Sequence, residues 1–488
     1  MLTRGQIISF YAIGGLFIAA NVIAVLFDFY FVPLFPIAFI IVLLALFAQD
    51  KLIYLVTGLV PFSIPVWHLM GNFGLILPTE PIIILLMIIG GLKLLNNEGG
   101  NNTRELMRNP LTIAILINVG WLLFTSATSS MPLVSFKYTV SRIWYIVVFY
   151  FMAYLLFTNY NRIEKFLWWF TIPLAGVVVY VMVRHYQHGF IRDVFPYMIQ
   201  PFFWVHGVYS ATVAITTPML IVFFIRSKQM GYSTLTRGFI ALAAMLFLLA
   251  ITYSYTRATW ISLMGALAAM AVFYIKVPIR FIFTSIFVVL LGIFVFQKDI
   301  MLKLSENEQG SSRKSDLGEH LQSVSNIKND PSNLERINRW NCAIRMFEER
   351  PVLGWGPGTY AFQYAPFQRS KDLTVISTNF GDVGHAHSEY LGPLAEGGLF
   401  GMLTWLGFFL LSVYKGMRLF YNSINEKTRT IALAVVLGLI TYYVHGVLNS
   451  YIDYDKIAVP LWGFCAILVA LEKIDKTFSN TAKESQKQ

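Results

Sequence analysis

The chain has 488 residues, of which 56% are hydrophobic and only 13% are charged, and its formal net charge is +11. With a mean hydropathy of +0.61, this composition excludes a water-soluble globular protein and indicates a polytopic membrane protein. Cys342 and Cys465 are the only cysteines, so a disulfide framework and a cysteine metal site are both excluded.

Apolar stretches long enough to cross a membrane recur along the chain. Windows of about 20 residues predict an all-α polytopic membrane protein with about 14 transmembrane helices, in a range of about 12 to 14. The first apolar run, Ile7 to Phe27, is too long for the core of a signal peptide, so it is interpreted as the first span. The predicted spans lie near 7–27, 31–48, 52–70, 78–94, 110–127, 139–157, 165–183, 207–225, 238–255, 258–275, 279–296, 389–414, 430–449 and 457–472.

These spans divide the chain into four parts. An N-terminal transmembrane bundle of about 11 spans, 1–296, is followed by one large extracytoplasmic loop, 297–388. A C-terminal group of about three spans, 389–472, leads to a short cytoplasmic tail, 473–488. The beginning of the loop, 304–329, is polar and lacks apolar periodicity, so we expect it to be mobile.

The distribution of lysine and arginine sets the expected orientation. With the N-terminus in the cytoplasm, most basic residues outside the long loop fall on the inner side, as the positive-inside rule requires. Both termini are therefore predicted to be cytoplasmic, and the long loop lies outside. The net positive charge then mostly faces anionic lipid, and it gives no reason to expect a nucleic-acid partner. A few arginines, among them Arg142 and Arg257, remain on the outer side, where each should have an anionic partner.

The second half of the loop has the pattern of an amphipathic helix over 333–349. Ser332 and Glu335 form a capping box at its start. Arg336 and Arg339, three residues apart, project from one adjoining face. For either arginine alone, a solvated surface is an equally good interpretation. The apolar positions are Leu334, Ile337, Trp340, Ile344 and Phe347.

A glycine-rich stretch, PVLGWGPGTY at 351–360, follows this helix. It has no lysine-serine ending and no strand before it, so it is not a nucleotide-binding loop. We predict a tight backbone turn that returns the loop helix toward the membrane. The alternative is direct contact between its N–H groups and a phosphate.

Two histidines and two carboxylates crowd the stretch 384–398, GHAHSEYLGPLAEGG, where the loop re-enters the membrane. Ser388 is predicted to be the N-cap of the next helix, which places His387 directly before the N-terminus of that helix. A helix N-terminus attracts phosphate and keeps a neighbouring imidazole neutral, the form that a general base needs. The alternative is that both histidines are ordinary interfacial residues. The titratable side chains are His385, His387, Glu389 and Glu396.

Polar residues gather again in the last outer connection, 443–456. Asp453 and Asp455 are the only pair there that resembles a metal site, and no cluster in the chain has the spacing of a divalent-cation site. We therefore expect neither a metal nor a cofactor. The alternative interpretation is structural, with Asp455 paired to Lys456 and Asn449 capping a helix.

Together these motifs resemble the O-antigen ligase and polymerase superfamily, extracytoplasmic membrane glycosyltransferases that use lipid-linked sugars. The matching elements are Thr256-Arg257 at the start of a span, Arg336-x-x-x-Trp340, the PVLGWGPGTY turn and HAHSEYLGPLAEGGLFG. The resemblance is specific over 332–401 and weaker around 252–262. The family commonly has Asn at the position of Ser388 and Ser at that of Thr256, and these departures bear on the acceptor more than on the reaction.

By this resemblance His387 is the catalytic base, and Arg257 and Arg336 hold the diphosphate of an undecaprenyl-diphosphate-linked glycan. The donor and its acceptor, lipid A–core or another glycan, meet at the periplasmic face of a bacterial inner membrane, whose lipid is the third partner. Further candidates for substrate binding are Arg339, Arg142 and His385, and candidates for a supporting role are Glu389, Glu396, Asp453 and Asp455.

The chemistry of these residues agrees with that assignment. A sugar on a lipid diphosphate already carries a good leaving group, so transfer needs the diphosphate charge held and the acceptor hydroxyl deprotonated. Arginines supply the first through planar, permanently charged contacts, and a neutral histidine supplies the second. We therefore expect a metal-independent, inverting glycosyl transfer.

Several functions remain open at this point. Ligation of O-antigen to lipid A–core is favoured over polymerisation of repeat units and over glycan transfer to protein. A polysaccharide flippase or transporter is the alternative from another class, but it predicts two related halves with comparable loops. This chain has a single asymmetric loop that carries most of the polar residues.

Overall fold

The computed structural model describes residues 4–27, 34–70, 73–96, 100–278, 331–374 and 384–485, with residues 280, 281, 284 and 377. Nearly all of the span predicted near 279–296, and the whole polar segment 304–329, lie outside these residues. The helices are α1 (Arg4–Leu26), α2 (Phe35–Phe47), α3 (Gln49–Leu59), α4 (Thr79–Leu95), α5 (Gly100–Met107), α6 (Pro110–Ala127), α7 (Pro132–Ile146), α8 (Ala153–Leu156), α9 (Tyr160–Gln187), α10 (Phe195–Met198), α11 (His206–Ile225), α12 (Ser227–Met230), α13 (Thr234–Thr252), α14 (Arg257–Ile275), α18 (Pro331–Glu349), α19 (Tyr360–Gln363), α20 (Leu391–Asn422), α21 (Glu426–His445) and α22 (Asp455–Ser485).

Among the described residues, nine helices are long and apolar enough to cross a membrane. They confirm the predicted class, a helical polytopic membrane protein. One of them runs without a break from α7 through a π-helical turn at Val147–Met152 into α8. The C-terminal helix continues well past the predicted span, so most of the predicted tail 473–488 is helical.

The third predicted span, 52–70, is wrong. Helix α3 ends at Leu59, and the chain then forms a two-stranded antiparallel hairpin of β1 (Ile64–Met70) and β2 (Phe73–Leu77). Pro61 and Pro65 lack the N–H groups that a continuing helix would need, so the apolar run turns into extended chain. This hairpin is the exception to the all-α prediction within the described part of the chain.

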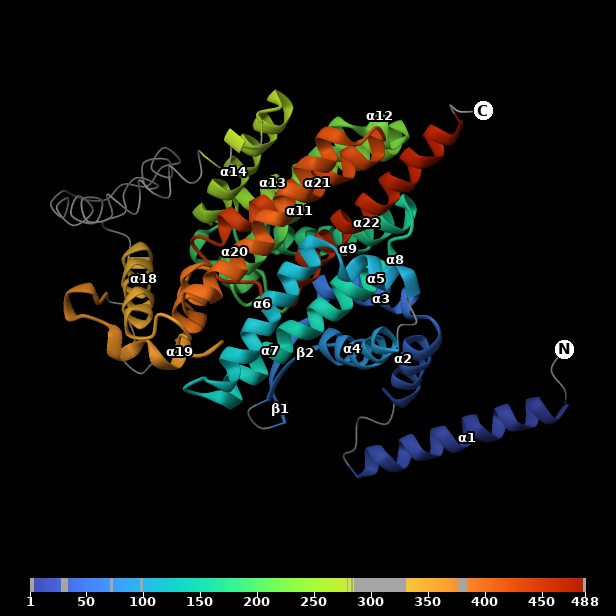
Figure 1. Ribbon diagram of the computed structural model, residues 1–488. Helices are drawn as coiled ribbons and strands as arrows, with labels where there is room; N and C mark the ends of the chain where they lie inside the picture. Colours follow the sequence, from blue (N-terminus) through green and yellow to red (C-terminus); the bar gives the residue numbers. More distant parts are fainter. Residues whose placement is uncertain are drawn as a thin grey trace.

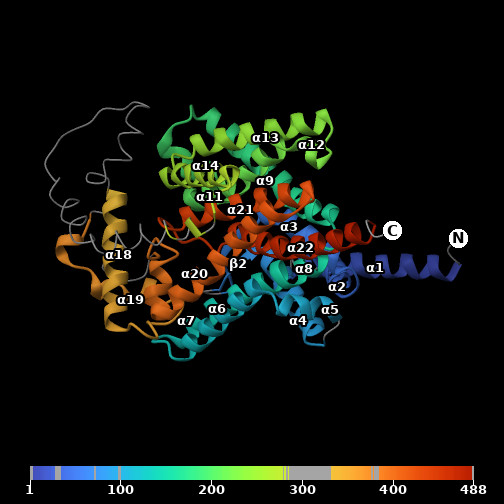
Figure 2. The ribbon, with the colours of Figure 1, turned by 45° about the horizontal axis from the view of Figure 1, so that its top comes forward.

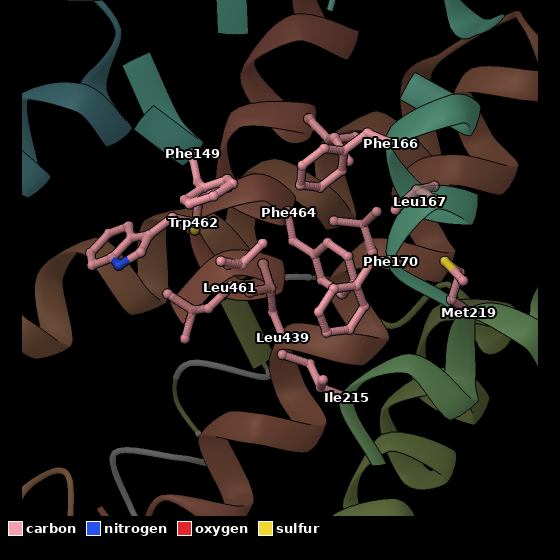
Figure 3. Packing of buried hydrophobic residues seen from close by; sticks show 14 of the residues in the cluster. Phe149, Phe166, Leu167, Phe170, Ile215, Met219, Leu439, Leu461, Trp462 and Phe464 are labelled. Carbon is pink, nitrogen blue, oxygen red and sulfur yellow. The ribbon is translucent and has the colours of Figure 1, made fainter. Parts of the chain in front are cut away.

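Helices α11, α21 and α22 form the centre of the bundle, because most residues of their membrane-spanning windows are buried. Figure 3 shows the packing, with side chains of α9, α11 and α21 surrounding α22. Burial on all sides is what a helix without a polar face requires. The buried side chains at this junction include Phe166, Phe170, Ile215, Met219, Leu439, Leu461, Trp462 and Phe464.

Helix α18 stands at one edge of the molecule, and α20 lies between it and the bundle (Figures 1 and 2). The helix predicted over 333–349 corresponds to α18, Pro331–Glu349. Helix α1 lies at the opposite edge in both views. The candidate residues of α18, of the histidine stretch and of the start of α20 therefore lie where α18 meets α20, at one end of the helix bundle.

Candidate active site

The glycine-rich turn fastens α18 to α20. Helix α20 leaves helical geometry at Gly398, where φ is 66° and ψ is −166°. Two N–H groups of the turn bond carbonyls just before this kink, Trp355 to Ala395 at 3.1 Å and Gly356 to Glu396 at 2.8 Å. The predicted tight turn is confirmed, and these two N–H groups are used to hold α20 rather than to face an anion.

Gly356 offers a direct test of this turn. Its φ is +110°, and a Cβ placed there would lie 1.9 Å from Ser129 Oγ and 2.8 Å from Ser135 Oγ. We expect Gly356→Ala to lower the free energy of unfolding by about 3 kcal/mol or more, with a matching loss of activity. Gly407→Ala is the control, because nothing lies within 4 Å of a Cβ at that helical position. Thermal unfolding of the purified variants measures the difference, and equal stability would show that the turn tolerates rearrangement.

Arg339 ties α18 to the histidine stretch. It is 5% exposed, and its Nε donates to Glu335 Oε1 at 2.8 Å. Its Nη1 donates to the carbonyl oxygen of His385 at 3.3 Å, and its guanidinium lies over the ring of Tyr364. Gly384 allows this approach, because a Cβ there would fall 2.0 Å from Nη1. Arg339 therefore holds the loop in place through buried, specific contacts.

His387 has an unusual backbone conformation. Its φ is +50°, in the left-handed region that residues other than glycine rarely adopt. The indole Nε1 of Trp340 donates to its carbonyl oxygen at 3.3 Å, so α18 holds the residue in this conformation. Such strained residues are concentrated at functional sites. The side chain of His387 is half-buried, whereas His385 is exposed.

The charge state of His387 follows from its surroundings. Burial is the largest cause, followed by the positive charges of Arg339 and Arg336, and together they lower the pKa of His387 to about 3. The imidazole is therefore neutral at physiological pH. This is the form that can accept a proton, although burial and the two arginines, rather than the helix terminus invoked from the sequence, are the main causes.

The positive charge of Arg336 influences three histidines from different parts of the chain. It lies within electrostatic range of His387, of His206 at the start of α11, and of His445 at the end of α21. The sequence motifs did not point to His206 as a site residue. Its only signal was its position at the outer start of a predicted span, next to an aromatic stretch.

Arg257 lies at the same end of the bundle. Phe273, near the end of α14, packs against Phe420 just before α21, whereas Gly265 faces Val444 near the end of α21. The two helices therefore run in opposite directions. Arg257 precedes Gly265 by eight residues, which is about 12 Å of helix, so it projects beyond the end of α21. The structure thus places Arg257 and Arg336 at one end of the molecule.

Ser388 and Glu389 anchor the start of α20. Ser388 Oγ accepts the N–H groups of Tyr390 and Leu391, both at 3.3 Å, so it caps the helix as predicted. Oε1 of the buried Glu389 accepts the Tyr442 hydroxyl at 2.5 Å and the N–H groups of Tyr451 and Ile452 at 2.7 and 2.9 Å. Burial is the largest cause that raises the pKa of Glu389, and it is opposed by the Tyr442 hydrogen bond. Glu389 therefore fixes the connection between α21 and α22 beside the histidine stretch.

The two late aspartates point to different places. Asp453 pairs with the buried Arg142, whose Nη2 lies 2.8 Å from Asp453 Oδ1. Asp455 accepts the Ser63 hydroxyl at 2.5 Å, and its Oδ1 lies 3.5 Å from Lys456 Nζ. Over the described ranges, no group of three or more His, Cys, Asp or Glu residues is arranged to hold a metal ion. The carboxylates of Asp453 and Asp455 therefore face different protein partners.

The carboxylate of Glu396 is used to hold the glycine-rich turn. Its Oε1 accepts the N–H of Tyr360 at 3.0 Å, at the end of the glycine-rich turn.

The structure thus brings Arg336, Arg339, His385 and His387 together, while Arg142, Glu389, Glu396 and Asp455 are engaged in internal contacts. Arg336 and His387, the two residues of this group to which the sequence resemblance gave the main roles, are therefore close together in the structure.

Comparison with known proteins supports the resemblance predicted from the sequence. A family model described as O-antigen ligase matches residues 240–406, a range that includes Arg257, Arg336 and His387. An uncharacterized protein from Haemophilus influenzae is similar, with 21% identity over 253 residues, which cover 51% of this chain and 60% of that protein. Over residues 240–406 the match supports the predicted resemblance to the O-antigen ligase and polymerase superfamily, and the apolar helices agree with a multi-pass membrane protein.

Proposed function

We propose that this chain is a glycosyltransferase that moves a glycan from undecaprenyl diphosphate to an acceptor hydroxyl, and that its reaction is ligation of O-antigen to lipid A–core. The single observation that carries the proposal is the position of His387, which is neutral, held by α18, and within electrostatic range of Arg339 and Arg336. A base next to a fixed positive charge suits a reaction whose leaving group is a diphosphate.

The proposed reaction is a single displacement. The acceptor oxygen attacks the anomeric carbon while the bond between that carbon and the diphosphate oxygen breaks. His387 takes the proton of the acceptor hydroxyl, and the diphosphate leaves with the bonding electron pair. Arg336 and Arg257 stabilise the charge that develops on it. Attack from the face opposite the leaving group inverts the anomeric configuration.

We assign the other candidate residues to supporting roles around His387, Arg336 and Arg257. Arg339 holds the carbonyl of His385, and Arg142 holds Asp453, so we assign both to positioning rather than to the diphosphate. Glu389 and Glu396 keep the start and the kink of α20 in place. His385 is exposed and in electrostatic range of Asp453, which suits a supporting contact with substrate.

The proposed location is the periplasmic side of the bacterial inner membrane, with both termini in the cytoplasm. The charge distribution supports it, because most lysines and arginines outside the long loop fall on the opposite side. Lys427 and Arg429, for example, lie in the first turn of α21, at the end remote from His445.

We expect transfer to survive chelation. The described site presents arginines and histidines to the substrate, and its carboxylates are engaged by Arg142, backbone N–H groups and hydroxyls. In this proposal the arginines neutralise the charge of the diphosphate, as a divalent cation does in other diphosphate sites. Purified protein assayed with and without EDTA should give equal rates. A loss of rate that Mg²⁺ or Mn²⁺ restores would contradict this assignment.

Deletion of the gene, followed by analysis of the lipid carrier, tests the proposed function. A ligase leaves long glycan chains on undecaprenyl diphosphate, and this is the expected result. Single repeat units on the carrier would instead indicate a polymerase. An unchanged external pool with carrier retained on the cytoplasmic side would indicate a flippase and contradict glycosyl transfer.

A further inference from the structure

A cavity of about 230 Å³ lies beside the candidate active site. Its walls come from the β1–β2 hairpin, from the segment just before α11, and from the start of α22. The sequence motifs did not predict this cavity. It contains neither the histidine stretch nor an arginine of α18, so it is a separate feature of the fold.

Two chain segments link the cavity to the active site. Val205 lines the cavity and precedes His206, which lies in electrostatic range of Arg336. Tyr454 also lines it and follows Asp453, which is held by Arg142. The lining of the cavity therefore comes within one residue, along the chain, of His206 and of Asp453.

The lining combines aromatic rings with charged groups. Phe202, Phe203, Trp204 and Tyr454 contribute four rings, and Trp204 is 49% exposed, which leaves its indole accessible. The carboxylate of Glu80 also lines the cavity, and its Oε2 accepts the N–H of Ile76 at 2.7 Å. An accessible ring next to fixed polar groups matches the general pattern of small-ligand sites.

Lys456 brings a second charge to this wall. It is 4% exposed, its Nζ donates to the carbonyl oxygen of Ser63 at 3.0 Å, and it lies 5.2 Å from the centre of the Phe203 ring. Asp455 compensates its charge. The lysine and the aspartate are thus held rigidly in the wall of the cavity.

We propose that this cavity binds one sugar ring of the glycan substrate, with Trp204 stacked on the apolar face of the ring and Glu80 accepting its hydroxyl groups. A pyranose has an apolar C–H face and a polar edge, which suits one aromatic wall and one carboxylate wall. A polyprenyl chain would leave the polar side chain of Glu80 without a hydrogen-bonding partner from the ligand. This proposal rests on the proposed glycosyl transfer, and it adds the subsite that recognises the sugar.

Binding of carrier-free oligosaccharides to the purified protein tests the subsite. The two probes are the glycan released by mild acid from the lipid carrier and the core oligosaccharide released from lipopolysaccharide. We expect Trp204→Ala to weaken binding of one of them about tenfold, and Trp204→Phe to restore most of it. The probe that responds identifies the sugar as belonging to the donor or to the acceptor.

Two controls show whether the loss of binding is specific to the cavity and to the sugar. Trp169→Ala removes a tryptophan of similar exposure, 40%, on α9 outside the cavity, and should bind both probes as the wild type does. Undecaprenyl diphosphate without sugar should bind Trp204→Ala normally. Equal binding of both oligosaccharides to the wild type and Trp204→Ala would overturn the proposal, and so would an equal loss of undecaprenyl diphosphate binding.

The same experiment distinguishes the subsite from the proposed function. If the wild type transfers glycan and Trp204→Ala binds both probes normally, the subsite is wrong and glycosyl transfer stands. If a probe binds through Trp204 and no glycan is transferred, the subsite stands and the proposed function is wrong.

Discussion

Replacing His387 with alanine is expected to lower the turnover of glycan transfer by a factor on the order of 10² or more, with the lipid-linked donor still bound. His387 is the histidine whose carbonyl is held by Trp340 and whose ring lies within electrostatic range of Arg336. His385 is exposed, and its contact with Arg339 is made by its backbone carbonyl, which alanine retains. Replacing His385 with alanine should therefore cost much less.

The pH dependence of the wild type gives a second readout of the same group. In the free protein the pKa of His387 is lowered to about 3, so its base form persists through the usual assay range. A bound diphosphate adds negative charge beside the ring and raises this pKa. Because kcat reports the complex and kcat/KM the free protein, the acid-side fall should occur at higher pH in kcat than in kcat/KM.

Transfer rate and donor binding, measured at matched expression, decide between the histidines. If His387→Ala remains active while His385→Ala is inactive, the base is the exposed histidine and the role of α18 in holding it is wrong. If both variants remain active, general-base catalysis does not come from this stretch. If kcat and kcat/KM fall at the same pH on the acid side, the diphosphate does not raise the pKa of His387.

Replacing Arg336 with lysine, which retains the charge, is expected to remove most transfer activity while the protein level is unchanged. A lysine ammonium cannot reproduce the planar fork of a guanidinium, which contacts two oxygens of a diphosphate at once. Arg257→Lys should have a similar effect, because the start of α14 projects past the end of α21 toward the same region. We expect a loss on the order of tenfold to a hundredfold for each, which corresponds to about 1.4 to 3 kcal/mol.

Arg369→Lys is the matched control for these variants. Arg369 belongs to the same part of the chain as α18 and is exposed, so its lysine variant should transfer at the wild-type rate. Arg192 is less suitable, because it lies within electrostatic range of His206. Normal transfer by both Arg336→Lys and Arg257→Lys would show that the diphosphate is held elsewhere.

The sequence predicted the local parts of this site well. The apolar spacing of α18 and the serine cap at Ser388 are short-range signals, and both appear in the structure at nearly the expected residues. Glu335 departs from its predicted capping role, because its carboxylate binds Arg339 one turn further along the helix. Its other oxygen accepts hydrogen bonds from Thr374 and Ser377, distant contacts that a local sequence pattern does not reveal.

Contacts between distant segments were not predictable from one sequence. Arg142 and Asp453 are separated by 311 residues, and nothing local to either marks the pair. The approach of Arg336 to His206 and His445 depends on how α18 is tied to α20. The β1–β2 hairpin replaced a predicted span because an apolar run alone does not distinguish a membrane helix from extended chain.

The most direct measurement of the central claim is the release of undecaprenyl diphosphate from lipid-linked glycan by the purified protein in the presence of acceptor. Glycosyl transfer at His387 predicts that the wild type releases one carrier for each glycan transferred, and that His387→Ala releases none above spontaneous hydrolysis while still binding the donor. Absence of release by the wild type, or equal release by His387→Ala, would contradict glycosyl transfer at His387.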